Sequence, residues 1–279
     1  MNKLVPMAIM ASLVLAACGG SSKGSSAPAQ KLAITTKDFS LSLDGSALRP
    51  GPLDISALNK GKQAHGVLLG RINDGVDAKT VTSTITKDPT KALTMFSLAG
   101  GMPALPAGGT AWNARTTLRS GTYIVIDTGA GKDGKANYTK PGEVQTFQVS
   151  GSARAAAAAK SDADVSLRDY AIDMPASIPA KAHLRIRNTG QDNHELLFVS
   201  VPNEKAGATY IRLIRSGKQV EFKSHPLTAL GPTGPGTDTT VPIDIPPGHY
   251  LAYCAFASAK SKGKPHAALG MVRQVTVTK

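Results

Sequence analysis

Short stretches in which apolar and polar residues alternate recur along most of this chain. Alternation with a period of two is typical of β-strands that bury one face. The clearest stretches are residues 32–35, 40–43, 66–72, 121–126, 144–149, 165–167, 182–188, 196–201, 241–245, 250–254 and 272–277. Residues 80–98 and 208–216 each have room for a short helix. Because strands and helices do not alternate regularly, the pattern predicts an all-β fold of Greek-key β-sandwiches.

The chain repeats itself once. Residues 59–65 read NKGKQAH and residues 188–194 read NTGQDNH, an offset of 129. Residues 118–127 read LRSGTYIVID and residues 245–254 read IPPGHYLAYC, an offset of 127. A repeat of this length corresponds to whole domains and not to the units of a solenoid. We therefore expect two tandem β-sandwich domains, at residues 31–150 and 165–279, with residues 151–164 as the linker between them.

The start of the chain has the pattern of a targeting segment. Residues 4–16 form an apolar run that is too short to span a bilayer as a mature helix. The run ends in Leu15-Ala-Ala-Cys18, which resembles the lipobox of bacterial lipoproteins. The resemblance implies a lipoprotein signal peptide at residues 1–17, a lipid on Cys18 and a flexible tether at residues 18–30. The mature protein would then be exported and anchored by its lipid to a bacterial membrane; the alternative is an ordinary signal peptide with an incidental cysteine.

Basic residues outnumber acidic ones, 32 to 19, which gives a formal net charge of +13. A basic surface favours anionic partners, such as lipid headgroups or an acidic redox or cell-envelope protein. The chain has no arginine-rich run and no basic stretch interleaved with aromatic residues. We therefore expect no nucleic-acid partner.

Comparison of the two copies singles out residues that carry chemistry. His194, Cys254, His266 and Met271 in the second copy stand where the first copy has His65, Asp127, Tyr138 and Glu143. Two imidazoles, a thiolate and a thioether are the ligand types of a mononuclear blue-copper site. The first copy keeps only one of the four, so the comparison predicts one copper ion, in the second domain. The alternative for Cys254 is a packed thiol, because free cysteine behaves as a small apolar residue.

Residues 165–279 resemble the cupredoxin family, including its plastocyanin-like domains. In that family one histidine lies early, and the cysteine, second histidine and methionine follow late, which is the order found here. The resemblance implies nitrogen ligands from His194 and His266, a thiolate ligand from Cys254 and a long axial contact from Met271. Residues 31–150 would then be a degenerate domain of the same kind, without the copper ligands.

One departure from the family lies between Cys254 and His266. Small blue-copper proteins generally have a short loop there, whereas this chain has the eleven residues 255–265, which include three lysines. A long loop costs little closure entropy, but it is expected to aim His266 less rigidly.

These observations lead to a first prediction of function, with alternatives. A lipid-anchored copper protein of the cell envelope would transfer electrons or handle copper. A metal-free binding or structural lipoprotein is the alternative, and copper storage or delivery without redox cycling is a third. The chain has no His-x-His pair, no Gly-x-Ser-x-Gly motif and no glycine-rich phosphate loop, so we expect it not to be an enzyme.

Overall fold

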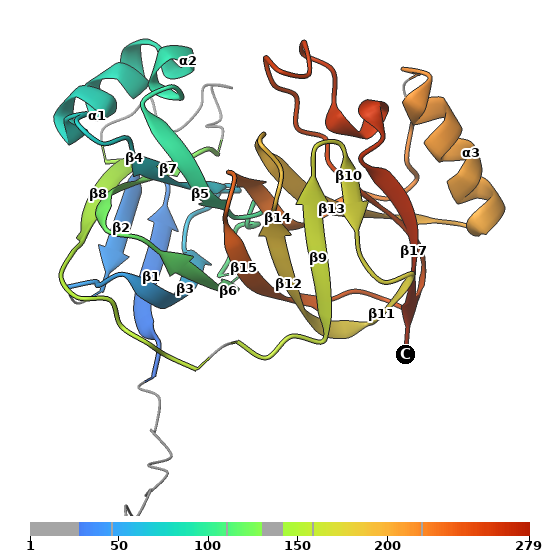
Figure 1. The fold of residues 1–279 in the computed structure, drawn as a ribbon, viewed down its shortest axis with the longest axis horizontal. Coiled ribbons are helices and arrows are strands. Elements are labelled where there is room, and N and C mark those ends of the chain that lie inside the picture. Colours follow the sequence, from blue (N-terminus) through green and yellow to red (C-terminus); the bar gives the residue numbers. More distant parts are fainter. Residues whose placement is uncertain (1–27, 46, 110, 130–141, 158, 219) are drawn as a thin grey trace, which may run out of the picture.

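The computed structural model describes residues 28–279 except residues 46, 110, 130–141, 158 and 219 (Figure 1). In the first copy the strands are β1 (Gln30–Lys37), β2 (Ser40–Asp44), β3 (Gly51–Asn59), β4 (Val67–Ile72), β5 (Phe96–Gly101), β6 (Ala111–Leu118), β7 (Gly121–Asp127) and β8 (Val144–Val149). In the second copy they are β9 (Ala163–Arg168), β10 (Ala171–Asp173), β11 (Ser177–Pro179), β12 (Lys181–Asn188), β13 (His194–Val201), β14 (Leu227–Thr233), β15 (Asp238–Asp244), β16 (Gly248–Tyr253) and β17 (Val272–Thr278). The predicted all-β sandwich class is confirmed. The signal peptide and Cys18 lie outside the described residues and stay predictions.

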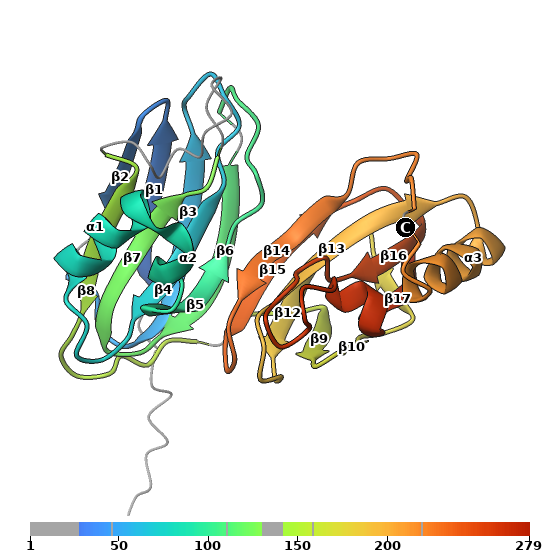
Figure 2. The same ribbon diagram turned by 90° about the horizontal axis from the view of Figure 1, so that it is seen from above.

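Both sheets run through both copies. One sheet has the order β10-β9-β12-β15-β6-β3-β1-β2, and the other has the order β11-β17-β16-β13-β14-β5-β4-β7-β8. Each strand of the first copy has a counterpart in the second, for example β3 and β12, or β7 and β16. When every strand is replaced by its counterpart and the order is reversed, each sheet gives the same order again, apart from the extra strand β11. The duplication is therefore a pair of equivalent sandwiches that meet edge to edge (Figures 1 and 2).

Few residues make the junction between the sandwiches. In one sheet β6 pairs with β15 through Thr116 and Thr239, and in the other β5 pairs with β14 through Gly101 and Gly231. A Cβ atom built on Gly231 would lie 2.9 Å from the carbonyl carbon of Gly101. Because real Cβ atoms do not approach backbone so closely, both sites suit glycine. Trp112, the single tryptophan of the chain, packs against the apolar cores of both copies.

Helices occupy the same connection in both copies. In the first copy α1 (Ala78–Lys87) and α2 (Pro89–Ala92) lie between β4 and β5, and in the second copy α3 (Glu204–Arg215) lies between β13 and β14. The two longer helices have N-cap residues. The Asp77 side chain caps α1 by accepting from Thr80 N, and the Asn203 side chain caps α3 by accepting from Ala206 N. Residues 80–98, where the sequence has room for a short helix, contain most of α1, all of α2 and the start of β5. No helix of the described part of the chain is both long and apolar enough to cross a membrane.

Candidate metal centre

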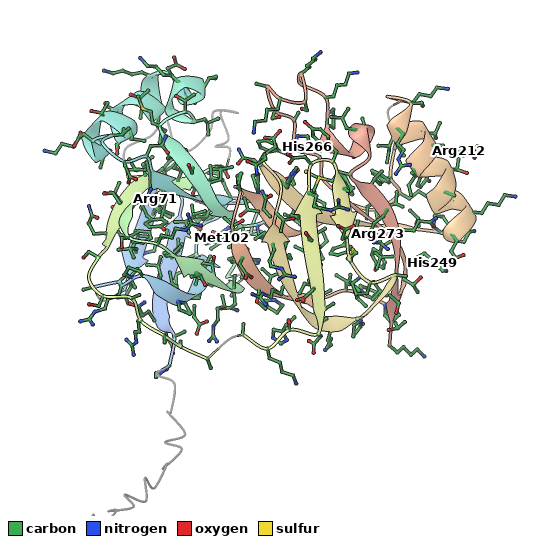
Figure 3. All side chains as sticks on the ribbon, in the orientation of Figure 1. Arg71, Met102, Arg212, His249, His266 and Arg273 are labelled. Carbon is green, nitrogen blue, oxygen red and sulfur yellow. The ribbon has the colours of Figure 1, made fainter. Side chains whose placement is uncertain are left out.

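Neighbouring strand ends in the second copy carry the predicted ligands. His194 opens β13, and Cys254 directly follows β16, which pairs with β13. His266 opens the short 3-10 helix η2 (His266–Leu269), and Met271 directly precedes β17. All four side chains have 0% exposure. Figure 3 shows His266 near one end of the second sandwich.

Three of the four side chains converge. One potential ligand atom each from His194, Cys254 and His266 lies within 4.8 Å of the others. The Nδ1 atoms of the two histidines are 3.1 Å apart, and Cys254 Sγ lies 3.7 Å from His266 Nδ1. Met271 joins them through the backbone, because its carbonyl accepts from Cys254 N and its N–H donates to His266 O. Its role as a fourth ligand stays a prediction.

The spacing of these atoms fits a metal ion. Bonds of about 2.0 Å to nitrogen and about 2.3 Å to sulfur, at tetrahedral angles, separate two nitrogens by about 3.3 Å and nitrogen from sulfur by about 3.5 Å. The observed 3.1 Å and 3.7 Å are close to these separations. Two imidazoles and one thiol also form a donor set suited to copper. Among the described residues, this is the one cluster of three such ligands.

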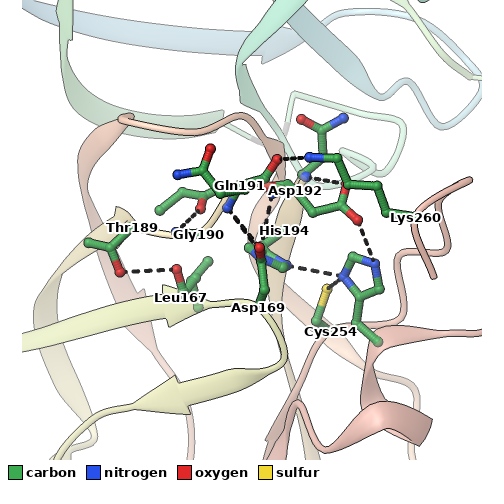
Figure 4. Close-up of polar contacts among 12 residues, drawn as sticks. Leu167, Asp169, Thr189, Gly190, Gln191, Asp192, His194, Cys254 and Lys260 are labelled. Atoms are coloured by element: carbon green, nitrogen blue, oxygen red, sulfur yellow. Dashed lines mark hydrogen bonds and ion pairs between the residues drawn. The ribbon is translucent and has the colours of Figure 1, made fainter.

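Two aspartates that the sequence did not single out contact the far sides of the histidine rings. Asp169 Oδ1 lies 2.8 Å from His194 Nε2, and Asp192 Oδ2 lies 3.4 Å from His266 Nε2 (Figure 4). A carboxylate that accepts a hydrogen bond from Nε2, as Asp169 does from His194, favours the tautomer whose Nδ1 lone pair is free to bind a metal. Asp192 contacts His266 by charge alone, because its distance and direction do not make a hydrogen bond to Nε2. Burial acts to raise the pKa of Asp169, but hydrogen bonds from Gln191 N, His194 and Asp192 N outweigh burial and lower that pKa.

A glycine lets Asp169 reach His194. A Cβ atom on Gly190 would lie 2.3 Å from Asp169 Oδ1 and 2.8 Å from His194 Nε2. The Asn188 side chain holds the same loop, since its Oδ1 accepts from Gly190 N and its Nδ2 donates to Asp192 O. The repeated Asn-x-Gly pattern is therefore the frame that aims the histidine.

The first copy has the same frame but different chemistry. Asn59 Oδ1 accepts from Gly61 N, and a Cβ atom on Gly61 would lie 2.8 Å from His65 Nε2. His65 Nδ1 forms a buried hydrogen bond with Asp127, the counterpart of Cys254, and its Nε2 lies 3.3 Å from Asp38 Oδ1. A carboxylate thus takes the place of the thiol. Tyr138, the counterpart of His266, lies outside the described residues.

The acid–base state of the second-copy site follows from its burial. Burial raises the pKa of the Cys254 thiol to about 12. Burial, followed by the charge of His194, lowers the pKa of His266. Without a metal, near-neutral pH therefore leaves a protonated thiol beside a neutral His266 imidazole.

This state predicts how copper affinity depends on pH. A metal must displace the proton of Cys254, whereas His266 has none to lose above pH 7. We expect the logarithm of the Cu(I) association constant to rise by about one per pH unit between about pH 7 and 9. Competition against a chelator of known pH dependence measures the slope. A slope near zero would mean that the thiol does not bind the metal.

A buried carboxyl in the first copy gives a second pH-dependent prediction. Burial, and next the charge of Asp127, raise the pKa of Glu143 from 4.5 to about 7. Between these two pH values the folded state holds a proton on Glu143 that the unfolded chain releases. The contribution of neutral Glu143 to stability is therefore complete below about pH 4.5 and is lost as the pH rises to about 7. Glu143→Gln should leave Tm unchanged at pH 4.5 and raise it by about 5 °C at pH 8. Thermal unfolding of both proteins at each pH measures this; Glu204→Gln, at the exposed start of α3, is the control, and equal Tm values for Glu143→Gln and wild type at pH 8 would refute it.

Comparisons with known proteins find solved structures that are similar to this chain, but they assign the chain to no family. No protein-family model matches the chain, and no curated protein matches it. Similar solved structures include auracyanin from the photosynthetic bacterium Roseiflexus castenholzii, with 20% identity over 42% of this chain and 95% of that chain and a TM-score of 0.28. They also include a multicopper oxidase, with 13% identity over 89% and 88% of the two chains and a TM-score of 0.26. A copper-containing nitrite reductase from Thermus scotoductus has 12% identity over 89% of this chain and 61% of that chain, with a TM-score of 0.24.

These findings correct one prediction. The missing enzyme motifs were expected to exclude catalysis, but the structures similar to this chain include an oxidase and a reductase. The prediction that the chain is not an enzyme is therefore wrong as an exclusion. Identities and TM-scores this low assign no activity.

Proposed function

We propose that the second copy binds one copper ion and that the protein transfers electrons or handles copper in the cell envelope. The observation that carries the proposal is the convergence of three buried donor atoms, from His194, Cys254 and His266, at separations suited to one metal ion. Met271 is the candidate for a fourth, weaker contact. Lipid on Cys18 would hold the protein at a membrane.

The residues around the site support this function by fixing the ligands before the metal arrives. Bound copper would supply a one-electron couple. Asp169 holds the His194 ring through Nε2, and Glu195 N donates to Cys254 Sγ at 3.4 Å. Ligands held on strand ends and by neighbouring groups change position little between two oxidation states. A partner with an acidic surface suits the net charge of +13.

Copper reconstitution with an absorption spectrum tests the proposal. We expect one copper per chain and a visible sulfur-to-copper band on addition of Cu(II). Asp127→Ala removes the counterpart of Cys254 from the first copy and should leave the stoichiometry at one. Two ions per chain would contradict the assignment to the second copy, and no binding of either Cu(I) or Cu(II) would favour the metal-free binding lipoprotein. A reversible redox titration would then favour electron transfer over delivery.

A further inference from the structure

The segment between Cys254 and His266 is folded by its own hydrogen bonds and contacts the candidate metal centre through Phe256, whose ring packs against His266. Ser258 N donates to Ser261 Oγ at 2.9 Å, and Gly263 N donates to Ser258 O at 2.9 Å. These bonds hold residues 258–263 in consecutive turns. A β-bridge between Ala257 and Pro265 joins the two ends. We call residues 255–265 the lid. Its internal bonds explain how a long insertion still aims His266.

Two side chains tie the lid to the loop that leads into β13. The Ser258 hydroxyl donates to Asp192 Oδ2 at 2.5 Å. Lys260 Nζ donates to Gln191 O, as Figure 4 shows. Both acceptors belong to the loop that precedes His194. The lid therefore connects the segments that carry the two histidines.

Asp192 links these ties to a candidate ligand. Its Oδ2, which accepts from Ser258, also lies 3.4 Å from His266 Nε2. Its Oδ1 accepts from Asn193 N at 2.8 Å, and the residue is only 6% exposed. The first copy has Gln63 at this position. The bridging carboxylate thus belongs to the copy that carries the candidate ligand set.

We propose that the lid is a gate for metal entry, latched by Ser258 and Lys260, and that Asp192 couples its closure to the orientation of His266. The purpose of the gate rests on the proposed copper function, but the gate itself is a property of the metal-free chain. The four candidate ligands have no exposed surface, and Phe256 of the lid packs against the His266 ring with 5.7 Å between ring centroids, so lid opening would expose His266 to an ion from solvent. Opening breaks the two latch bonds and the packing of Phe256 on His266 but leaves the sheets intact, which makes it a local event that precedes global unfolding.

Alkylation of Cys254 measures opening without any metal. The full chain with Cys18→Ala keeps Cys254 as its only thiol, and the rate at which iodoacetamide modifies this buried thiol follows the open population. We expect Ser258→Ala and Lys260→Met each to raise the rate about fivefold, the population change that follows the loss of one typical hydrogen bond. Lys264→Met removes the same charge from an exposed part of the lid and should leave the rate unchanged.

Copper then tests the coupling. Transfer of Cu(I) from a chelator complex into the metal-free chain should be faster in Ser258→Ala and Lys260→Met by the same factors as alkylation, with the final affinity within about twofold of wild type. Asp192→Asn should raise both rates and also lower the Cu(I) affinity about tenfold or more, because it removes the negative charge that lies 3.4 Å from His266 Nε2. Adding Ser258→Ala to Asp192→Asn should change the alkylation rate no further.

The outcomes separate the gate from the copper assignment. Unchanged alkylation in both latch variants, or an equal rise in Lys264→Met, overturns the gate. Wild-type Cu(I) affinity in Asp192→Asn overturns the coupling to His266. Faster alkylation in the latch variants of a chain that binds no copper supports the gate and overturns the proposed function.

Discussion

Replacing Cys254 by Ser is expected to lower the copper affinity at least about a thousandfold and to abolish the visible absorption band of the copper complex. A hydroxyl is a hard donor with a far higher pKa than a thiol, so it is a poor ligand for Cu(I) and supplies no sulfur-to-copper transition. Cys254 also contributes the only thiol within reach of His194 and His266 among the described residues. Competition titration with Cu(I) and an absorption spectrum with Cu(II) measure the two effects.

Two further variants make this result specific. Cys18→Ser removes the other cysteine of the chain and should keep both the affinity and the band. Met271→Leu should keep the band but change its shape and raise the reduction potential, because a weak axial donor tunes a copper site more than it holds the ion. A Cys254→Ser protein that retains wild-type affinity would show that the thiol packs in the core and that copper, if bound, lies elsewhere.

The sequence predicted three side chains that converge in the candidate metal centre, because the first copy can be compared with the second position by position. His65 and His194 occupy the same frame, whereas Asp127 and Cys254 differ at one strand end. A residue that changes chemical type within a retained frame stands out without any structure. The alternation of apolar and polar residues was enough for the fold class, because each copy buries one face of most of its strands.

The supporting aspartates could not be recognised in the same way. Asp169 lies 25 residues before His194 and reaches it because β9 and β10 turn back beside the loop at Gly190. Asp38 does the same for His65 in the first copy, so the repeat contained a signal, an aspartate followed by an aromatic residue. Asp192 has no such counterpart, and its role depends on where the lid folds.

The joining of the two sandwiches was also not predictable from local patterns. Gly100 and Gly101 end β5, where Gly101 pairs with Gly231 of the other copy. Glycine there allows two backbones to approach. Local rules read glycine as a turn signal, and only the pairing of segments about 130 residues apart reveals the other use.

The two copies differ in the group that contacts Nδ1 of the equivalent buried histidine. In the second copy the Nδ1 side of His194 faces His266 and the candidate metal centre. In the first copy the Nδ1 side of His65 faces the Asp127 carboxylate. A buried imidazole nitrogen left without any partner is costly. The first copy therefore satisfies this nitrogen with the Asp127 carboxylate, whereas in the second copy the corresponding nitrogen lies 3.1 Å from His266 Nδ1.

Replacing Asp127 by Ala is therefore expected to lower the free energy of unfolding by about 3 kcal/mol, since it removes a buried carboxylate that accepts hydrogen bonds from other groups. The variant leaves His65 Nδ1 without its carboxylate and Gly129 N without the Asp127 Oδ1 acceptor at 2.7 Å. It also removes a charge that raises the pKa of Glu143, so the loss of stability between about pH 4.5 and 7 should shrink.

Urea unfolding of the metal-free protein at several pH values measures both effects, because bound metal would otherwise add its own stabilisation. The matched control is Cys254→Ala at the equivalent strand end, which removes a small buried group and should cost only about 1 kcal/mol. Equal losses in the two variants would mean that Asp127 only fills space. A larger loss for Asp127→Ala, together with a weaker pH dependence, would show that the first copy uses the histidine of the shared frame in a structural hydrogen bond to Asp127.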